Sequence, residues 1–126
     1  MYKFGNKSAE RLAPVHPDLQ RLFNAAIENS PYDFSITEGL RSLSRQKELV
    51  EAKKSTTMNS RHLTGKAVDI AVFVDGAVSW DIKVYRTVAD HIKPLSILMQ
   101  IPIVWGGDWK SFVDGPHFEL DRNVYP

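Results

Sequence analysis

The sequence contains no cysteine, which excludes thiolate metal ligands, thiol nucleophiles and disulfide bonds. It has no apolar run of the roughly 18 residues that a membrane-spanning helix needs. The first residues, Met1 to Lys7, lack the apolar core of a signal peptide. We therefore expect the chain to be made in the cytoplasm, so that any substrate beyond the membrane is reached only with the help of another factor.

A strong charge of either sign is also missing. The 16 Lys and Arg residues nearly balance the 15 Asp and Glu residues, and both kinds are mixed along the chain. No basic stripe is present to bind a nucleic-acid backbone. The 126 residues are enough for one domain but not two, and the chain contains no internal repeat or linker. We therefore expect a single monomeric domain over residues 1–126, without a separate substrate-binding domain.

Apolar periodicity predicts several helices. The expected helices run from Pro17 to about Asn29, from Ser42 or Ser44 to about Lys53, and from Asp81 to about Gln100. Pro94 lies inside the third, where it either kinks one helix or starts another, and we favour a kink or a short break. In the second helix, Leu43, Leu49 and Val50 are expected to face the core.

Runs of apolar or alternating residues predict strands. They are Phe34 to Thr37, Val68 to Val74, Ile101 to Trp105 and Phe118 to Leu120. Asp75-Gly76 is a hairpin signal after the clearest of these, and Ala77-Val78 is expected to return beside it. Because the helices and strands do not alternate regularly, the pattern predicts an α+β domain.

The remaining segments are predicted to be loops or surface. Met1 to Pro14 is polar and is expected to lie along the surface, with Leu12 as its anchor. Lys54 to Asn59 is predicted to be a loop that delivers the residues after it, and Asp121 to Pro126 a tail. The tryptophans expected in the core are Trp80 and Trp105.

A histidine and an aspartate, His62 and Asp69, lie on either side of Gly65. Asp69 falls in the apolar segment from Val68 to Val74, where a buried unpaired charge would be costly. A metal ion is one partner that the carboxylate could have, and His62 could share it. Taken alone, a His–Asp pair is more often a structural hydrogen bond, so the pair by itself leaves both interpretations open.

A third candidate ligand, His117, lies near the C-terminus in the stretch from Asp114 to Leu120. Two histidines and one aspartate on a zinc ion leave a fourth position open for water, as a catalytic site requires. The alternative for His117 is a partly solvated histidine at the start of a strand. The other histidines, His16 and His91, are expected to be ordinary surface residues.

The stretch from Ser60 to Asp69 resembles, at every fixed position, the S-x-H-x-x-G-x-A-x-D motif of zinc peptidases that cut D-amino-acid-containing peptides of bacterial cell walls. These include D-alanyl-D-alanine carboxypeptidases and dipeptidases and L-alanyl-D-glutamate endopeptidases. The stretch from Asp114 to Glu119 resembles their second motif, with an acid three residues before the last ligand. From Phe4 to Trp109 the chain is similar to the phage endolysin branch, which cuts L-alanyl-D-glutamate bonds.

The resemblance implies a small, mainly antiparallel sheet with helices packed on one side and zinc in a groove on the other, as in the DD-peptidase and Hedgehog-like fold. It implies one zinc ion per chain, held by His62, Asp69 and His117. It further implies an endolysin that hydrolyses the L-alanyl-D-glutamate bond of peptidoglycan stem peptides in host cell lysis. Such an enzyme waits in the cytoplasm of the infected cell until a separate holin-type protein permeabilises the membrane. The alternatives are a D-alanyl-D-alanine dipeptidase or carboxypeptidase, and a zinc-containing cell-wall-binding module without catalysis.

The resemblance makes Asp114 the general base, which takes a proton from the attacking water and passes it to the leaving amine. Without the resemblance, Asp114-Gly115 would be interpreted as a simple turn. Glu119 is the rival base, because residues two apart on a strand share a face and Glu119 would lie on the His117 side. We favour Asp114 as the base and Glu119 as a group that orients a metal ligand.

Arg41 is implied to polarise the scissile carbonyl and to stabilise the oxyanion that forms from it. The alternative is a surface arginine paired with Glu38 or Asp33. The resemblance also gives the positions expected to contact substrate, which are Ser60, Gln46 and, in the wall of the groove, Trp109.

Overall fold

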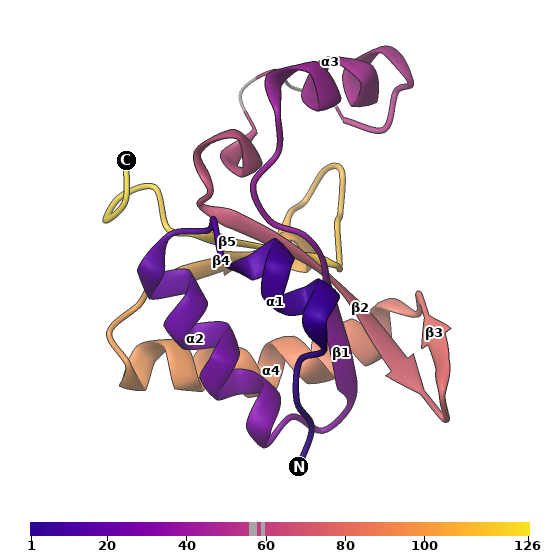
Figure 1. Cartoon of the computed structure of the whole chain (residues 1–126), viewed down its shortest axis with the longest axis vertical. Coiled ribbons are helices and arrows are strands. Elements are labelled where there is room, and N and C mark those ends of the chain that lie inside the picture. The colour runs from indigo at the N-terminus through magenta and orange to yellow at the C-terminus, as the bar shows by residue number, and fades with distance from the viewer. Residues whose placement is uncertain (56–57, 59) are drawn as a thin grey trace.

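A computed structural model describes residues 1–55, 58 and 60–126 as one α+β fold (Figure 1). In chain order its elements are α1 (Asn6–Leu12), α2 (Pro17–Glu28), β1 (Asp33–Glu38), α3 (Leu43–Glu51), the 3₁₀ turn η1 (Arg61–Thr64), β2 (Ala67–Val74), β3 (Ala77–Ser79), α4 (Ile82–Leu98), β4 (Ile103–Trp105), the 3₁₀ turn η2 (Gly106–Asp108) and β5 (His117–Leu120). Of the loop expected over 54–59, Thr56, Thr57 and Asn59 lie outside the described residues.

All strand pairs of the sheet are antiparallel, and the strands follow the order β1-β2-β5-β4. The long strand β2 is shared: β1 runs along one edge, while β5 and β3 pair with different parts of the other. Asp69 of β2 lies directly opposite His117 of β5. Residues from two distant parts of the sequence are therefore neighbours at the centre of the sheet.

Side-chain alternation along β2 and β5 separates the core from the site. Val68 and Ile70 of β2 and Phe118 of β5 belong to the core cluster, together with residues of α2 and α4. These two helices lie together below the sheet in Figure 1, whereas α3 projects away from them. Asp69 and His117 alternate with those core residues and point to the opposite face. The predicted α+β class, with an antiparallel sheet covered by helices on one side, is confirmed.

Helix α4 runs without interruption from Ile82 to Leu98 and contains Pro94. Asp81 caps its start, because its carboxylate accepts a hydrogen bond from the Lys83 backbone N–H at 3.0 Å. Because the helix continues past Pro94, the proline neither ends it nor starts another. Of the kink or short break expected here, the break is wrong and the kink stays a prediction.

Two apolar side chains expected inside are outside. Trp80 is 66% exposed, because it follows the short strand β3 and lies flat on the Tyr85 ring instead of entering the core. Leu43 is 64% exposed, because it begins the projecting helix α3. By contrast, Trp105 and Leu49 are buried as predicted.

Both ends of the chain are more ordered than their composition suggests. The N-terminal segment includes helix α1, which is held on β1 by a 3.0 Å hydrogen bond from the Ile36 backbone N–H to the Ser8 hydroxyl. At the other end, the Tyr125 hydroxyl donates to Asp18 at 2.7 Å, and the Arg61 guanidinium donates to the Tyr125 carbonyl at 2.5 Å. The C-terminal segment is therefore fastened to the loop that carries His62.

The two histidines expected at the surface hold helices in place. His16 precedes α2 and accepts a hydrogen bond from the Asp18 backbone N–H at 3.1 Å. The Nε2 atom of His91 lies 2.8 Å from the Ala26 carbonyl oxygen, so it donates a hydrogen bond that links α4 to α2. His16 and His91 are both half-buried, which corrects the expectation that they are ordinary surface residues.

Candidate metal centre

A short capped turn aims His62 at strand β2. The Ser60 hydroxyl accepts a 3.2 Å hydrogen bond from the His62 backbone N–H at the start of η1. Gly65 ends the turn with a φ of +69°, in the left-handed region that favours glycine. A Cβ atom at Gly65 would also lie 3.3 Å from the Pro14 carbonyl oxygen. The glycine of the motif therefore has a geometric reason, and His62 is left only 1% exposed.

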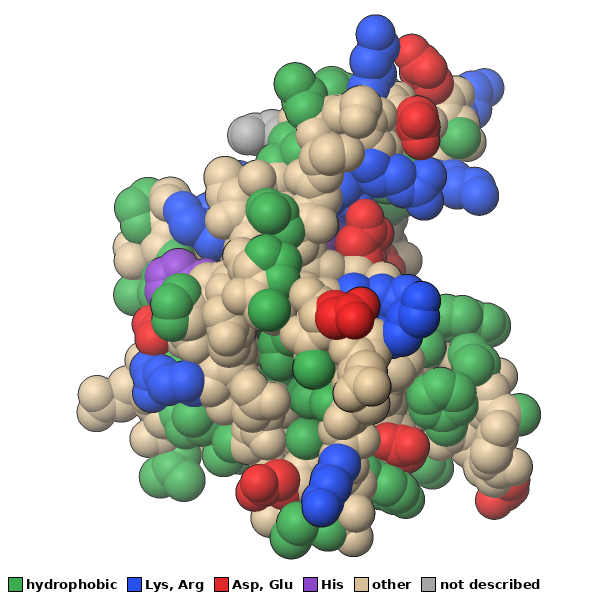
Figure 2. Space-filling view, in the orientation of Figure 1, with side chains coloured by type: hydrophobic (Ala, Val, Ile, Leu, Met, Phe, Trp, Pro, Cys, Tyr) green, Lys and Arg blue, Asp and Glu red, His purple; other side chains and the backbone are tan. Residues whose placement is uncertain are grey.

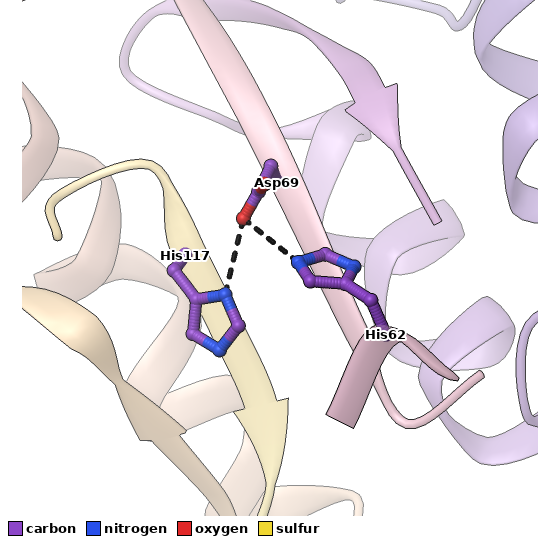
Figure 3. A group of neighbouring side chains, drawn as sticks. All are labelled: His62, Asp69 and His117. Carbon is purple, nitrogen blue, oxygen red and sulfur yellow. Dashed lines mark hydrogen bonds and ion pairs between the residues drawn. The ribbon is translucent and has the colours of Figure 1, made fainter. Parts of the chain in front are cut away.

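The structure brings together the three residues predicted as metal ligands (Figure 3). One carboxylate oxygen of Asp69 lies 3.2 Å from His62 Nε2 and 3.1 Å from His117 Nδ1. Ligand atoms about 2.0–2.1 Å from a tetrahedral metal ion lie roughly 3.3 Å apart. The two distances from Asp69 therefore match two edges of a triangular face of such a site, and all three ligand atoms lie within 4.8 Å of one another.

The protonation of the two rings favours a cation between them. His62 Nδ1 lies 2.8 Å from the Gly39 carbonyl oxygen, so that nitrogen carries the hydrogen. His117 Nε2 lies 2.9 Å from a Glu119 carboxylate oxygen and donates to it. In neutral rings the remaining nitrogens, His62 Nε2 and His117 Nδ1, then direct lone pairs at Asp69. A metal ion between them would accept all three lone pairs at once. Hydrogen bonds from the other ring nitrogens, here to Gly39 and Glu119, ordinarily orient metal-binding histidines in this way.

His62 Nε2 supports the same conclusion. It is buried and has no hydrogen-bond partner among the residues that the structure describes. A buried nitrogen without a partner is costly, because it has lost its water without replacement. Coordination of a metal ion removes that cost.

The charges around Asp69 keep its carboxylate ionised. Burial opposes ionisation, but the neighbouring rings of His117 and His62 outweigh it and lower the pKa of Asp69. Burial likewise opposes a charge on His117, but the carboxylates of Asp69 and Glu119 outweigh it and raise the pKa of His117 to about 9. The centre thus attracts positive charge, which a metal ion would supply in place of a proton.

Asp114 lies beside the ligands on a tight turn. Its backbone N–H donates to the Gly106 carbonyl at 3.0 Å, and its own carbonyl accepts from the His117 backbone N–H at 3.2 Å. A Cβ atom at Gly106 would lie 2.4 Å from the Asp114 carbonyl oxygen, so only glycine fits there. Burial, followed by the charge of Asp69, raises the pKa of Asp114. The role of Gly106 was missed in the sequence, where its only signal is the Gly106-Gly107 pair between two tryptophans.

Arg41 reaches the same site from the other side. Its guanidinium donates two hydrogen bonds of 2.7 Å to the Glu38 carboxylate and one of 2.7 Å to the Gln46 side-chain oxygen. It also lies 3.6 Å from the second carboxylate oxygen of Asp69. The pairing with Glu38 that was the alternative interpretation is therefore present, but Arg41 is almost buried and faces the metal ligands rather than open solvent.

Gln46 is placed differently from its expected role. Its side chain is 0% exposed, and its amide nitrogen donates to the Ser55 hydroxyl at 2.9 Å while its oxygen accepts from Arg41. Gln46 thus lies behind Arg41, where it orients the guanidinium and presents no surface to a substrate. Ser60 and Trp109 do line the cavity, and the Trp109 ring lies 5.0 Å from the His117 ring.

The metal ligands open into a cavity of about 830 Å³, a size typical of ligand-binding sites. The hollow lies between the projecting α3 and the body of the molecule (Figure 2). Arg41 and Asp114 line it together with His62, Asp69 and His117. Three candidate metal ligands, an ionisable carboxyl group and an arginine thus face one space, which is the arrangement of a single-metal hydrolase.

Comparison with known proteins identifies the hydrolase more closely. The chain belongs to the family of phage L-alanyl-D-glutamate peptidases, whose sequence model matches residues 1–124. This confirms the family and the reaction inferred from the two motifs. Within the described residues, no helix is long and apolar enough to cross a membrane.

Individual relatives agree with this assignment. The chain is 32% identical to the L-alanyl-D-glutamate peptidase of Escherichia phage T5, over 98% of this chain and 93% of that protein. It is 30% identical to the peptidoglycan L-alanyl-D-glutamate endopeptidase CwlK of Bacillus subtilis, over 97% and 85%. The crystal structure of the Serratia marcescens L-Ala D-Glu endopeptidase ChiX superposes with a TM-score of 0.91 at 43% identity, over 98% of this chain and 94% of that one.

Proposed function

We propose that this chain is a zinc endopeptidase that hydrolyses the L-alanyl-D-glutamate bond of peptidoglycan stem peptides and acts as an endolysin. The observation that carries the proposal is the convergence of two ring nitrogens on one Asp69 oxygen at 3.1 and 3.2 Å, inside a cavity of about 830 Å³. The family and the relatives named above supply the bond that is cut.

The choice of zinc rests on the donor set. Two imidazoles and one carboxylate in a tetrahedral arrangement suit Zn²⁺, whereas Mg²⁺ and Ca²⁺ prefer six or more oxygen ligands. When bound, the zinc ion would polarise the scissile carbonyl and lower the pKa of the attacking water to about 7. We expect one ion per chain, held by His62 Nε2, Asp69 Oδ1 and His117 Nδ1.

Asp114 is the proposed general base. It takes the proton of the attacking water and delivers it to the nitrogen of the leaving D-glutamate. Its position in the cavity beside His117 supports this role. The raised pKa also brings the carboxyl closer to neutral pH, where an efficient proton carrier should titrate.

Arg41 is proposed to stabilise the oxyanion. The hydrogen bonds to Glu38 and Gln46 use three of the five N–H groups of the guanidinium. The other two form no hydrogen bond among the described residues and are proposed to meet the scissile carbonyl oxygen, while the three bonds hold the charge in place before substrate arrives. Ser60 and Trp109 are proposed to contact the stem peptide from the cavity wall.

We further propose that residues 1–126 act as a single catalytic domain. One core cluster extends from Leu12 to Leu120, and the cavity draws residues from Glu38 to Asn123. As an endolysin made inside the cell, the protein would need a separate protein to permeabilise the membrane before it reaches the wall. Cells expressing this chain alone should therefore lyse little until such a protein is added, and rapid lysis without it would contradict the requirement.

The decisive experiment is a digest of defined muropeptides, followed by mass spectrometry. We expect the stem to be cut after its L-alanine, giving a product that begins with D-glutamate. A chelator should stop the reaction, and zinc should restore it better than magnesium or calcium. Release of free D-alanine would instead indicate the D-alanyl-D-alanine peptidase alternative. Bound zinc without any hydrolysis would indicate a non-catalytic wall-binding module.

A further inference from the structure

Two lysines on the wall of the catalytic cavity, Lys54 and Lys110, carry charges that nothing in the described chain neutralises. Both line the cavity and both are exposed. Within the described residues, neither ammonium group forms an ion pair or a side-chain hydrogen bond. Such lysines are available to a charged ligand, because no internal partner has to be displaced first.

The arginines of the same cavity are already engaged. Arg41 is bound by Glu38, as described above. Arg122 lies 3.6 Å from a Glu119 carboxylate oxygen, and Arg61 donates to main-chain carbonyls. Apart from Arg41, which is proposed to meet the scissile carbonyl, the two lysines are thus the cavity-lining cations left for a substrate within the part of the chain that the structure describes.

Each lysine is next in sequence to a residue tied to the catalytic centre. Lys54 precedes Ser55, whose hydroxyl is bonded to Gln46, the residue that holds Arg41. Lys110 follows Trp109, whose ring lies 5.0 Å from the His117 ring. The two lysines therefore line the cavity from two separate segments, each with a neighbouring residue that contacts the centre.

An anionic substrate that enters the cavity meets several carboxylates. Asp69, Asp114 and Glu119 all line it, together with Glu38 and Asp121. Like charges brought together in a binding site cost several kcal/mol unless they are compensated. A substrate that carries its own carboxylate near the scissile bond therefore needs positive partners on the wall.

The substrate of the proposed function has such a carboxylate. D-Glutamate contributes its amino nitrogen to the scissile bond, and a linear stem peptide uses only one of its two carboxyl groups to continue. The other is a free carboxylate a few bonds from the bond being cut, unless the cell converts it to an amide. Because this step assumes cleavage at D-glutamate, it rests on the proposed function.

We propose that Lys54 and Lys110 form a subsite for the free carboxylate of D-glutamate, and that this subsite makes the enzyme prefer unamidated stem peptides. The lysines act as specificity residues: they bind the substrate beside the reacting atoms and take no part in proton transfer. Lysine suits this task because its charge sits on a long flexible stem that can follow the ligand.

The test compares two synthetic stem peptides that differ only in whether D-glutamate carries the free carboxylate or its carboxamide. The wild-type enzyme should show a higher kcat/KM for the carboxylate peptide. Lys54→Met and Lys110→Met should each reduce that preference by about 2- to 10-fold, and the double variant should abolish it. The kcat/KM for the amide peptide should fall much less than that for the carboxylate peptide, and added salt should weaken the wild-type preference.

Lys47→Met is the matched control. Lys47 is an exposed lysine of α3 that does not line the cavity, so its loss removes the same charge elsewhere and should leave the preference intact. Equal cleavage of both peptides by the wild type, or an unchanged preference in the double variant, would overturn the subsite. A zinc-loaded wild type that cuts neither peptide between L-alanine and D-glutamate would instead overturn the proposed function, together with the subsite that depends on it.

Discussion

Two carboxylates next to His117 differ in what they contact, and this difference supports the different roles proposed for them. Glu119 accepts a hydrogen bond from His117 Nε2 at 2.9 Å and lies 3.6 Å from Arg122. Burial opposes its ionisation, but the hydrogen bond from His117 outweighs it and lowers the pKa of Glu119. Asp114 lacks such a partner among the described residues, and burial raises its pKa. Glu119 is therefore suited to fix a ligand ring, and Asp114 to carry a proton.

Replacement of Asp114 by asparagine tests that assignment. Asparagine is nearly isosteric, so the turn and His117 should stay in place, but its amide cannot accept the water proton. We expect turnover to fall by about two to four orders of magnitude, while bound zinc stays near one ion per chain. Zinc content and muropeptide hydrolysis should be measured on the same preparations.

Glu119→Gln is the comparison variant. It keeps the size of the side chain but weakens the support of His117, so metal affinity or activity should fall by roughly 10- to 100-fold. If Glu119→Gln were inactive with zinc still bound, while Asp114→Asn kept most of its activity, then Glu119 would be the base.

Gln46 and Arg41 give a second prediction at the residue scale. Arg41→Met should lower kcat by about 10²- to 10³-fold, the usual effect of losing one oxyanion donor. Gln46→Met should lower kcat less and leave KM nearly unchanged, because Gln46 is buried behind Arg41 and touches no substrate. Both variants should keep their zinc. A rise in KM alone for Gln46→Met would show that it contacts the stem peptide after all.

At the scale of elements, the turn that carries His62 depends on Gly65. Gly65→Ala should destabilise the fold by about 1–2 kcal/mol, the cost of placing an L side chain in the left-handed region. It should also weaken metal binding, because the new Cβ would press on the Pro14 carbonyl oxygen at 3.3 Å and shift the turn. Urea unfolding and zinc titration measure the two effects separately.

Gly76→Ala is the control for that variant. Gly76 also has a positive φ, +81°, but no atom lies within 4 Å of the position of its Cβ. Gly76 lies in the turn of the β2–β3 hairpin, and that turn does not carry any of the metal ligands. Gly76→Ala should therefore lose a similar amount of stability with no change in zinc affinity. Equal loss of zinc affinity in both variants would mean that general destabilisation, rather than the position of His62, explains the Gly65 result.

The elements that local pattern determines were the ones predicted correctly. Strand β2 is a long apolar run before a hairpin signal, and α2 and α4 have continuous apolar stripes, so each was expected close to its observed bounds. Helix α1 has only 7 residues, too few to be stable without tertiary contacts. It is held on β1 by the hydrogen bond between Ser8 and Ile36, which are 28 positions apart in the sequence. No local pattern reports such a contact.

The candidate site also contains residues that the sequence could predict and contacts that it could not. His62, Asp69 and His117 could be named from two short motifs, and the structure brings them together. The burial of Gln46 behind Arg41, and the docking of Tyr125 on Asp18, depend on how separate segments pack. Contacts between side chains of separate segments produce no recognisable residue spacing in the sequence, so these positioning contacts can be seen only in the structure.

At the scale of the whole molecule, a bound metal ion would join parts of the chain that are distant in sequence. His62 and Asp69 belong to the η1–β2 region, whereas His117 begins β5. An ion that binds only the folded arrangement stabilises it by mass action, by about 2.7–4.1 kcal/mol at 100 to 1,000 times its Kd. For a domain of this size, that corresponds to a rise in Tm of roughly 8 to 20 °C.

Removal of the metal by a chelator should therefore lower Tm by a similar amount, and zinc should restore it. Calorimetry on the wild type, with zinc content measured before and after chelation, checks this. In His117→Ala the chelator should have little effect, because a ligand is already lost, whereas Asp114→Asn should respond like the wild type, because Asp114 is proposed as a base and not as a ligand. If the wild-type Tm were unchanged once zinc had been shown to leave, the ion would not link β2 to β5, and the geometry of the three ligands would be set by the protein fold alone.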